Sequence, residues 1–193
     1  MADIAKYFPK LLVFEGGFVN DPLDRGGATN MGVTLSTFKA HGHDNDGDGD
    51  IDVQDLRNQT EEQAMGICKL NYWDRWKADQ IKSQSVAESL VEWVWGSGKW
   101  GIVIPQRILG LTDDGIVGPK TLEAVNKADP PRFHERLREA KMSFIDGLVA
   151  ASIQTYRQSH PLATDEELIR HTQKRFEKGW KRRIDAFKYE PTI

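Results

Sequence analysis

Apolar side chains return every three or four residues along most of the chain, and this spacing predicts a mainly α-helical protein. Helices are expected over residues 3–15, from 60 to beyond 73, over 86–94, over 104–109, from 119 onward, over 130–148 and over 164–180, with one or two further turns at 35–40. Thr60 and Thr164 each begin a capping box, which marks a helix start. Seven or eight helices are therefore predicted.

The first predicted helix ends in an acidic side chain. Leu11, Leu12 and Glu15 share one face of a helix, so the carboxyl of Glu15 lies at the end of an apolar stripe. Pro9 either kinks this helix or marks its true start, and in both cases these three residues keep a common face. In a cleft, desolvation would favour the protonated carboxyl that a general acid needs. The alternative is a surface glutamate at a helix end.

The segment over residues 15–34, EGGFVNDPLDRGGATNMGVT, follows at once and is rich in glycine. Phe18–Val19 and Met31–Thr34 are its extended pieces, so one small hairpin is predicted here. Its glycines, with Asp21 and Asp24, are typical of a chain that turns sharply and approaches a ligand closely. The two aspartates can equally cap the local backbone, and that alternative stays open.

Residues 44–55, DNDGDGDIDVQD, match the spacing of an EF-hand calcium loop. The expected ligands are Asp44, Asp46, Asp48, Asp50 through its backbone carbonyl, and Asp55. Gly49 stands at the sharp turn and Asp52 at the position that acts through water. The last ligand is Asp rather than Glu, which favours a structural Ca²⁺ site over a switch. The alternative is a solvated acidic loop, but six aspartates within twelve positions repel one another unless a cation compensates them.

Composition sets limits on the class of protein. The 193 residues carry a formal charge of −3, which argues against a general nucleic-acid binder. The single cysteine, Cys68, cannot form an internal disulfide and is expected as a buried thiol. The N-terminus lacks the pattern of a secretory signal and no stretch approaches membrane-spanning length, so we expect synthesis in the cytoplasm and no stable membrane insertion. A monomer is expected.

The chain divides most plausibly at Ser83–Ser85, because a new apolar helix begins immediately afterwards. The expected domains are a catalytic lobe over residues 1–83, with the calcium loop inserted at 44–55, and a helical lobe over residues 84–193. The two lobes are expected to pack as one compact unit. Neither an organic cofactor nor an internal repeat is indicated.

The glycine-rich signature, EGGF-V-N-D-P-x-D-x-G-G-x-T-x-x-G-V-T, resembles that of the glycoside hydrolase family 108 muramidases. The second half resembles the type 3 peptidoglycan-binding domain through VEWVWGSG, IPQRILG and DDGIVGPKTLEAV. Members of the family have also been labelled secretion activator proteins. The resemblance implies a lysozyme-like helical fold with a small hairpin at the active site. It also implies hydrolysis of the β-1,4 bond between N-acetylmuramic acid and N-acetylglucosamine, with Glu15 as the catalytic acid.

Glycoside hydrolysis needs a second group beside the acid, to stabilise the developing oxocarbenium ion or to activate water. Asp24 lies nine positions after Glu15, a spacing similar to the Glu-Asp-Thr set of phage lysozymes, with Thr29 as the residue that positions water. Asp21 competes with Asp24, and Thr34 competes with Thr29. Three tryptophans, Trp93, Trp95 and Trp100, flank a glycine-containing segment expected to border the cleft. Each can stack on a sugar ring, or can equally belong to the core.

Three functions remain to be compared. A muramidase acting on the bacterial cell wall is the leading hypothesis, and its substrate would be reached after release by another system. A wall-binding protein that does not cut, associated with secretion or wall remodelling, is the alternative. A calcium sensor is disfavoured because such proteins usually carry EF-hands in pairs and only one loop is visible. Whether the context is prophage lysis, wall remodelling or secretion stays open.

Overall fold

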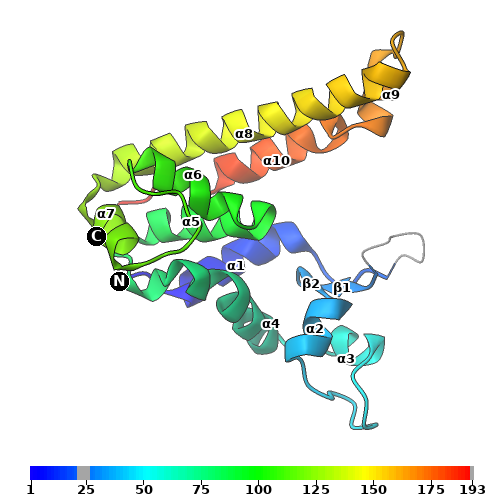
Figure 1. Cartoon of the computed structure of the whole chain (residues 1–193). Helices are drawn as coiled ribbons and strands as arrows, with labels where there is room; N and C mark the ends of the chain where they lie inside the picture. The colour runs from blue at the N-terminus through cyan, green and yellow to red at the C-terminus, as the bar shows by residue number, and fades with distance from the viewer. Residues whose placement is uncertain (21–26, 192–193) are drawn as a thin grey trace. The chain divides into compact units, whose positions relative to one another are not determined.

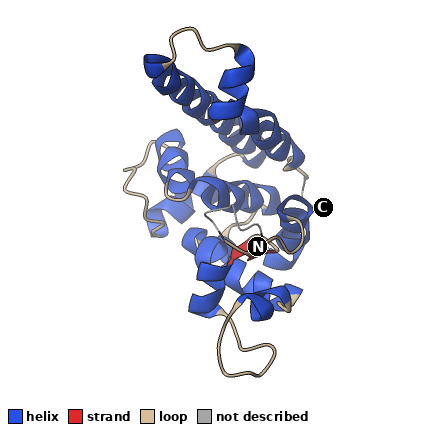
Figure 2. Cartoon of the chain, turned by 90° about the vertical axis from the view of Figure 1, so that its right-hand side faces the viewer, coloured by secondary structure: helices blue, strands red, loops and turns tan. Residues whose placement is uncertain are grey.

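The computed structural model describes residues 1–20 and 27–191, and the chain divides into two compact units, Met1–Gln80 and Ile81–Ile193. The described residues are mostly helical with one two-stranded antiparallel sheet, as Figure 2 shows, which confirms the mainly α-helical prediction with one small hairpin. No described helix is long and apolar enough to cross a membrane.

The first unit contains four α-helices among its described residues. Its elements are α1 (Ile4–Glu15), β1 (Thr29–Asn30), β2 (Val33–Thr34), α2 (Leu35–His41), α3 (Val53–Arg57), α4 (Glu61–Cys68) and the short turns η1 (Lys69–Trp73), η2 (Asp74–Trp76) and η3 (Ala78–Gln80). Helix α1 begins at Ile4, capped by the Asp3 carboxylate, and runs through Pro9. The proline is therefore an internal residue, not the start of the helix. Tyr7 and Leu11 of α1 are fully buried.

The hairpin pairs Thr29 with Thr34 and Asn30 with Val33. Met31 and Gly32 both have positive φ, of 49° and 75°, so they form the tight turn of the hairpin. The prediction that Met31 is extended was wrong, because a two-residue loop needs left-handed backbone at both positions. The buried Asn30 side chain donates to the backbone oxygen of Leu56 at 2.8 Å, which ties the hairpin to α3.

The helix expected to run past Trp73 changes its geometry at Cys68. Cys68 and Trp73 are both buried, but five residues apart they would lie about 140° apart on a regular α-helix. The chain widens into the π-helical turn η1 before tightening into the 3₁₀ turn η2, which turns both side chains inward. The prediction of one regular α-helix was therefore wrong at this point. Burying Trp73 requires a different number of residues per turn than a regular α-helix has.

The second unit contains six α-helices among its described residues: α5 (Gln84–Ser97), α6 (Trp100–Ile108), α7 (Pro119–Lys127), α8 (Pro130–Ser159), α9 (Asp165–His171) and α10 (Lys174–Ala186). Helix α10 packs along α8, and α9 joins them at one end (Figure 1). Gly101 of α6 lies against the backbone of α5, where a Cβ would come 2.4 Å from the Val94 nitrogen. Only glycine permits this approach.

Two helical segments of this unit differ from the sequence prediction. Helix α6 begins at Trp100, four residues earlier than expected. The single stretch predicted over 164–180 consists of two helices, because Thr172 is extended and its hydroxyl donates back to the Leu168 oxygen at 2.6 Å. The capping boxes at Thr60 and Thr164 are both formed as predicted.

Candidate active site

Glu15 is the last residue of α1, followed by Gly16 at a φ of 70°. Its side chain is half-buried, and α1 packs against α4. The charge of Glu15 acts on two side chains of the α4–η1 segment, Cys68 and Tyr72. The apolar stripe of α1 that the sequence predicted therefore ends close to the Cys68 thiol and the Tyr72 hydroxyl.

Cys68 and Tyr72 stand four residues apart and face this carboxylate. Burial, with the Glu15 charge as a second cause, raises the pKa of the Cys68 thiol to about 12, so the thiol is neutral at physiological pH. Burial also raises the pKa of the Tyr72 hydroxyl, followed by the charges of Cys68 and Glu15. Cys68 is a buried free cysteine, as predicted. Neither residue was predicted as a neighbour of Glu15, although their i,i+4 spacing places them on one helix face.

Of the other predicted catalytic residues, the structure describes the two threonines but not the two aspartates. Asp21 and Asp24 lie outside the described residues. Thr29 is half-buried in β1, where its backbone exchanges two hydrogen bonds of 2.8 Å with Val19. Thr34 begins α2, since its hydroxyl accepts from the Thr37 amide at 3.2 Å. Of the two threonines, Thr34 therefore has a structural role as a helix cap.

The aspartate loop lies between α2 and α3, with helices on both sides as in an EF-hand. The Asp44 carboxylate accepts from the amides of Gly47 at 2.6 Å and Gly49 at 2.9 Å. Gly49 has a φ of 97°, which the sharp turn requires. Carboxylate oxygens of Asp44, Asp46 and Asp48 come within 4.8 Å of one another. The first three predicted ligands are thus gathered around one point.

Asp55 closes the loop from its far end. It is fully buried and accepts from the amides of Asn45 at 2.5 Å, Asp52 at 2.8 Å and Asp46 at 3.2 Å. These bonds, that of Asp52 foremost, lower the pKa of Asp55. Its carboxylate groups with those of Asp50 and Asp52, again within 4.8 Å. Asp50 belongs to this group through its side-chain carboxylate, whereas the sequence analysis predicted its backbone carbonyl as the ligand.

The acidic side chains of this loop repel one another. The charge of Asp48 raises the pKa of Asp50, and burial followed by the neighbouring aspartates raises that of Asp46. A hard cation with oxygen ligands fits such a donor set, because its charge offsets the repulsion and its size suits six to eight oxygens. The loop therefore has the chemistry that Ca²⁺ prefers.

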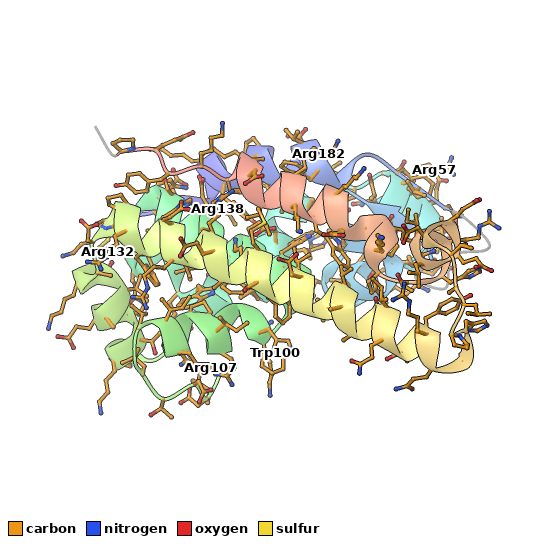
Figure 3. All side chains as sticks on the ribbon, turned by 90° about the horizontal axis from the view of Figure 1, so that it is seen from above. Arg57, Trp100, Arg107, Arg132, Arg138 and Arg182 are labelled. Atoms are coloured by element: carbon orange, nitrogen blue, oxygen red, sulfur yellow. The ribbon has the colours of Figure 1, made fainter. Side chains whose placement is uncertain are left out.

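The three predicted sugar-stacking tryptophans belong to the second unit and differ in exposure. Trp93 is buried at 3% exposure and its ring makes a T-shaped contact with that of Phe144, so Trp93 belongs to the core. Trp95 is half-buried. Trp100 is 43% exposed and projects from α6 on the same side as Arg107 (Figure 3). The Arg107 guanidinium lies 6.0 Å from the Trp100 ring centroid.

Comparison with known families matches two models to this chain. Residues 8–98 match the model described as Glycosyl hydrolase 108, and residues 100–185 match the model described as Predicted Peptidoglycan domain. Together the two matches indicate a peptidoglycan-related hydrolase, and they confirm the resemblance found in the sequence motifs.

The glycosyl hydrolase 108 match includes Glu15 and the aspartate loop, and it extends through α5 to residue 98. By contacts, α5 belongs to the second compact unit, which begins at Ile81. The family boundary and the structural boundary therefore differ by the length of one helix. Trp93 and Trp95 lie in the glycosyl hydrolase 108 match, whereas Trp100 opens the peptidoglycan-domain match.

A solved structure entitled "Structure of Brucella abortus SagA" is similar over nearly the whole chain. The two share 28% sequence identity and a TM-score of 0.69, and the alignment covers 95% of this chain and 90% of that chain. The likeness therefore includes both matched segments. No curated protein sequence matches this chain.

Proposed function

We propose that this protein hydrolyses the β-1,4 bond between N-acetylmuramic acid and N-acetylglucosamine in bacterial peptidoglycan, with Glu15 as the general acid. The observation that carries the proposal is the place of Glu15. It is a half-buried carboxyl at the end of α1, beside α4, within the segment matched by a glycosyl hydrolase family. The peptidoglycan-domain match supports the choice of substrate.

In this mechanism the Glu15 carboxyl gives its proton to the leaving glycosidic oxygen as the bond breaks. Tyr72 and Cys68 border this carboxyl, and burial keeps both neutral at physiological pH. They add no competing charge beside the acid.

The second group of the reaction is proposed to be Asp24, with Asp21 as its competitor and Thr29 as the residue that orients water. Such a carboxylate either stabilises the oxocarbenium-like transition state or activates the attacking water. Thr29 supports this role by its position, since it stands in the hairpin that follows Asp21 and Asp24 in the sequence.

We further propose that the aspartate loop binds one Ca²⁺ as a structural ion. Asp44, Asp46, Asp48, Asp50 and Asp55 would hold it, and its charge would compensate their mutual repulsion. Asn30 connects the hairpin to α3, the helix that leaves the loop, so an ordered loop would support the segment around Thr29. The ion takes no part in the proton transfer.

The catalytic proposal is tested on a purified peptidoglycan suspension. Replacing Glu15 by Gln keeps the size of the side chain but removes the proton donor, so clearing should slow by roughly 10²- to 10⁴-fold. Glu139→Gln serves as the matched control, because Glu139 is an exposed carboxylate on α8. A Glu15→Gln protein that folds normally and clears at the original rate would exclude Glu15 as the acid.

Product analysis tests the bond that is cleaved. Mass spectrometry of the released fragments should find a new reducing end on N-acetylmuramic acid. A reducing N-acetylglucosamine end would make the protein a glucosaminidase, and an anhydro end would make it a lytic transglycosylase. Binding to peptidoglycan without any new end would favour the non-catalytic wall-binding alternative, which the peptidoglycan-domain match also allows.

A further inference from the structure

Helix α10 concentrates positive charge. It carries six cationic and two acidic side chains, a formal charge of +4, in a chain whose formal charge is −3. All but its last residue lies in the segment that matches the peptidoglycan-domain model. Such an uneven distribution favours an anionic partner wherever the cations are not already paired within the protein.

Three of the six cations are paired within the second unit. Their partners are acidic side chains of neighbouring helices at 2.6 to 3.6 Å: Lys174 with Asp165, Lys181 with Asp146, and Arg183 with Glu92. All three cations are partly covered. They connect α10 to α9, α8 and α5, so their charges serve the packing of the helix.

The other three cations, Arg175, Lys178 and Arg182, are exposed, and we call them the basic row. Spacings of three and then four residues place them on one face of the helix, over roughly 10 Å of its axis. Figure 3 labels Arg182, the last of the three. Among the residues that the structure describes, no acidic side chain forms an ion pair with any of them. Arg175 contacts the ring of Phe176, which supplies no countercharge.

The two acids of α10 are engaged with other cations. Glu177 Oε1 lies 2.6 Å from Lys181 Nζ, and Asp185 Oδ1 lies 2.7 Å from Arg138 Nη2 of α8. The bond to Asp185 is the largest cause that raises the pKa of Arg138, so this acid is committed to α8. The basic row therefore presents three positive charges to solvent.

The surroundings of the basic row favour a narrow partner over a flat one. Asp165 and Glu166 of α9 are strongly exposed, and Asp165 reaches Lys174, the residue just before the row. A flat anionic membrane laid on the row would also meet these carboxylates, which would repel it. A linear polyanion can follow the row without covering them. The geometry therefore matches a strand that carries negative charges along its length.

We propose that the basic row binds the carboxylates that stem peptides carry along a peptidoglycan strand. Peptides with free carboxylates recur along such a strand, so it is a linear polyanion. The choice of this polymer rests on the proposed peptidoglycan function and on the peptidoglycan-domain match, which includes the whole row. The row would hold the wall polymer by charge complementarity and would take no part in cleavage.

Co-sedimentation of the full-length Glu15→Gln protein with purified insoluble peptidoglycan tests the proposal, because this variant is expected to leave the wall intact during the measurement. One wall sample keeps its carboxylates, and in a second sample they are converted to amides. Binding to the amidated wall should be roughly tenfold weaker, since the ion pairs are lost. Added salt should weaken binding to the native wall. Equal binding to the two walls would overturn the proposal.

A triple variant, Arg175→Gln, Lys178→Gln, Arg182→Gln, localises the contact. It should bind the native wall roughly tenfold more weakly than its parent and should no longer distinguish the native from the amidated wall. Normal folding is expected, because the three side chains are exposed and pair with no acid, and circular dichroism checks this. A variant that binds the native wall as tightly as its parent would overturn the proposal.

The matched control removes the same charge from other exposed positions of the second unit. Lys99, Lys120 and Arg132 are exposed cations that lie outside the basic row. Their combined replacement by Gln should leave wall binding unchanged. An equal loss in this control would mean that binding follows total charge and would overturn the proposal.

Two other anionic ligands test the choice of partner. Vesicles of equal parts phosphatidylglycerol and phosphatidylcholine represent a membrane, and double-stranded DNA represents a phosphate polymer. Neither should show binding that depends on the basic row at the salt concentration at which the wall binds. Row-dependent binding to one of them, without row-dependent binding to the wall, would assign the row to that partner instead.

The two proposals fail separately in this design. Glu15→Gln should lose cleavage and keep wall binding. The row variant with Glu15 intact should keep cleavage of short soluble glycan fragments that lack peptides. A wild-type protein that binds the wall through the row without cleaving glycan would remove the proposed hydrolase function and leave the row. Cleavage with wall binding that is independent of the row would do the reverse.

Discussion

The two units differ in how their concentrated acidic charge is placed and paired. In the first unit, six aspartates of one short loop are left with no cationic side chain among them, and five of them lie at or near the surface. In the second unit, Glu92 is buried between Lys141 and Arg183, which come from two other helices. The proposed calcium site would compensate the loop with a cation from solution, whereas Glu92 is compensated by side chains of its own chain. Stability should therefore respond to ions in the first unit and to side-chain substitution in the second.

The largest effect is expected from Glu92→Gln. It leaves Lys141 and Arg183 buried together without their shared carboxylate, and breaking a buried ion pair on one side costs about 3–5 kcal/mol of unfolding free energy. Urea denaturation followed by circular dichroism measures this. The triple replacement Glu92→Leu, Lys141→Met, Arg183→Leu should restore most of the loss, since no charge is then left unpaired. An unchanged midpoint for Glu92→Gln would mean that water reaches the cluster.

Removal of calcium should have the next largest effect, confined to the first unit. A chelator should lower the melting temperature, because an ion bound only to the folded state stabilises it by about 2.7 kcal/mol at a hundred times its dissociation constant. The double variant Asp44→Asn, Asp48→Asn should melt at the chelated temperature with or without chelator. If the wild type melts at the same temperature with and without chelator, the aspartate loop binds no stabilising ion.

A smaller, pH-dependent effect is expected at His134 of α8. Burial, with Lys141 as a second cause, lowers the pKa of His134 below its ordinary value of 6.5. The unfolded chain therefore takes up a proton at higher pH than the folded chain does. The contribution of neutral His134 to the free energy of unfolding is fully present above pH 6.5. It is lost as the pH falls through the lower pKa of the folded state. His134→Gln should flatten the melting temperature between roughly pH 6.5 and 5, and an unchanged slope would assign it to other groups.

The smallest effect is expected at the exposed pair of Arg107 and Asp113. Its Nε–Oδ2 distance is 2.5 Å, yet both side chains are largely in water, at 57% and 41% exposure. Exposed pairs contribute little because solvent screens them. Asp113→Asn should leave the melting temperature within error of the wild type. A clear drop would mean that the loop after α6 depends on this pair.

Much of the local structure could be predicted from nearby residues. Thr60 and Thr164 begin helices because each capping box needs only four consecutive residues. The aspartate loop lies between two helices, and hydrogen bonds from its own glycines to Asp44 define its turn. Glu15 at a helix end was predicted for the same reason, since i,i+4 spacing to Leu11 is a local property.

The structure differs from the sequence prediction where contacts with distant residues outweigh the conformational preference of the local sequence. The π-helical turn at Lys69–Trp73 exists because Trp73 must reach the core, which no local pattern records. Trp93 and Trp100 look alike in sequence and both rings contact Phe144 of α8, but Trp93 is 3% exposed and Trp100 is 43% exposed. Cys68 and Tyr72 come to Glu15 only because α1 packs against α4.

The sequence by itself determined the helical class, the acidic loop and the carboxyl that ends the first helix. All three rest on interactions between residues a few positions apart, which backbone geometry brings together in any fold. Only the tertiary structure decided which charges are buried and paired. Glu92 meets Lys141 across 49 positions and Arg183 across 91, and such contacts depend on how whole helices pack.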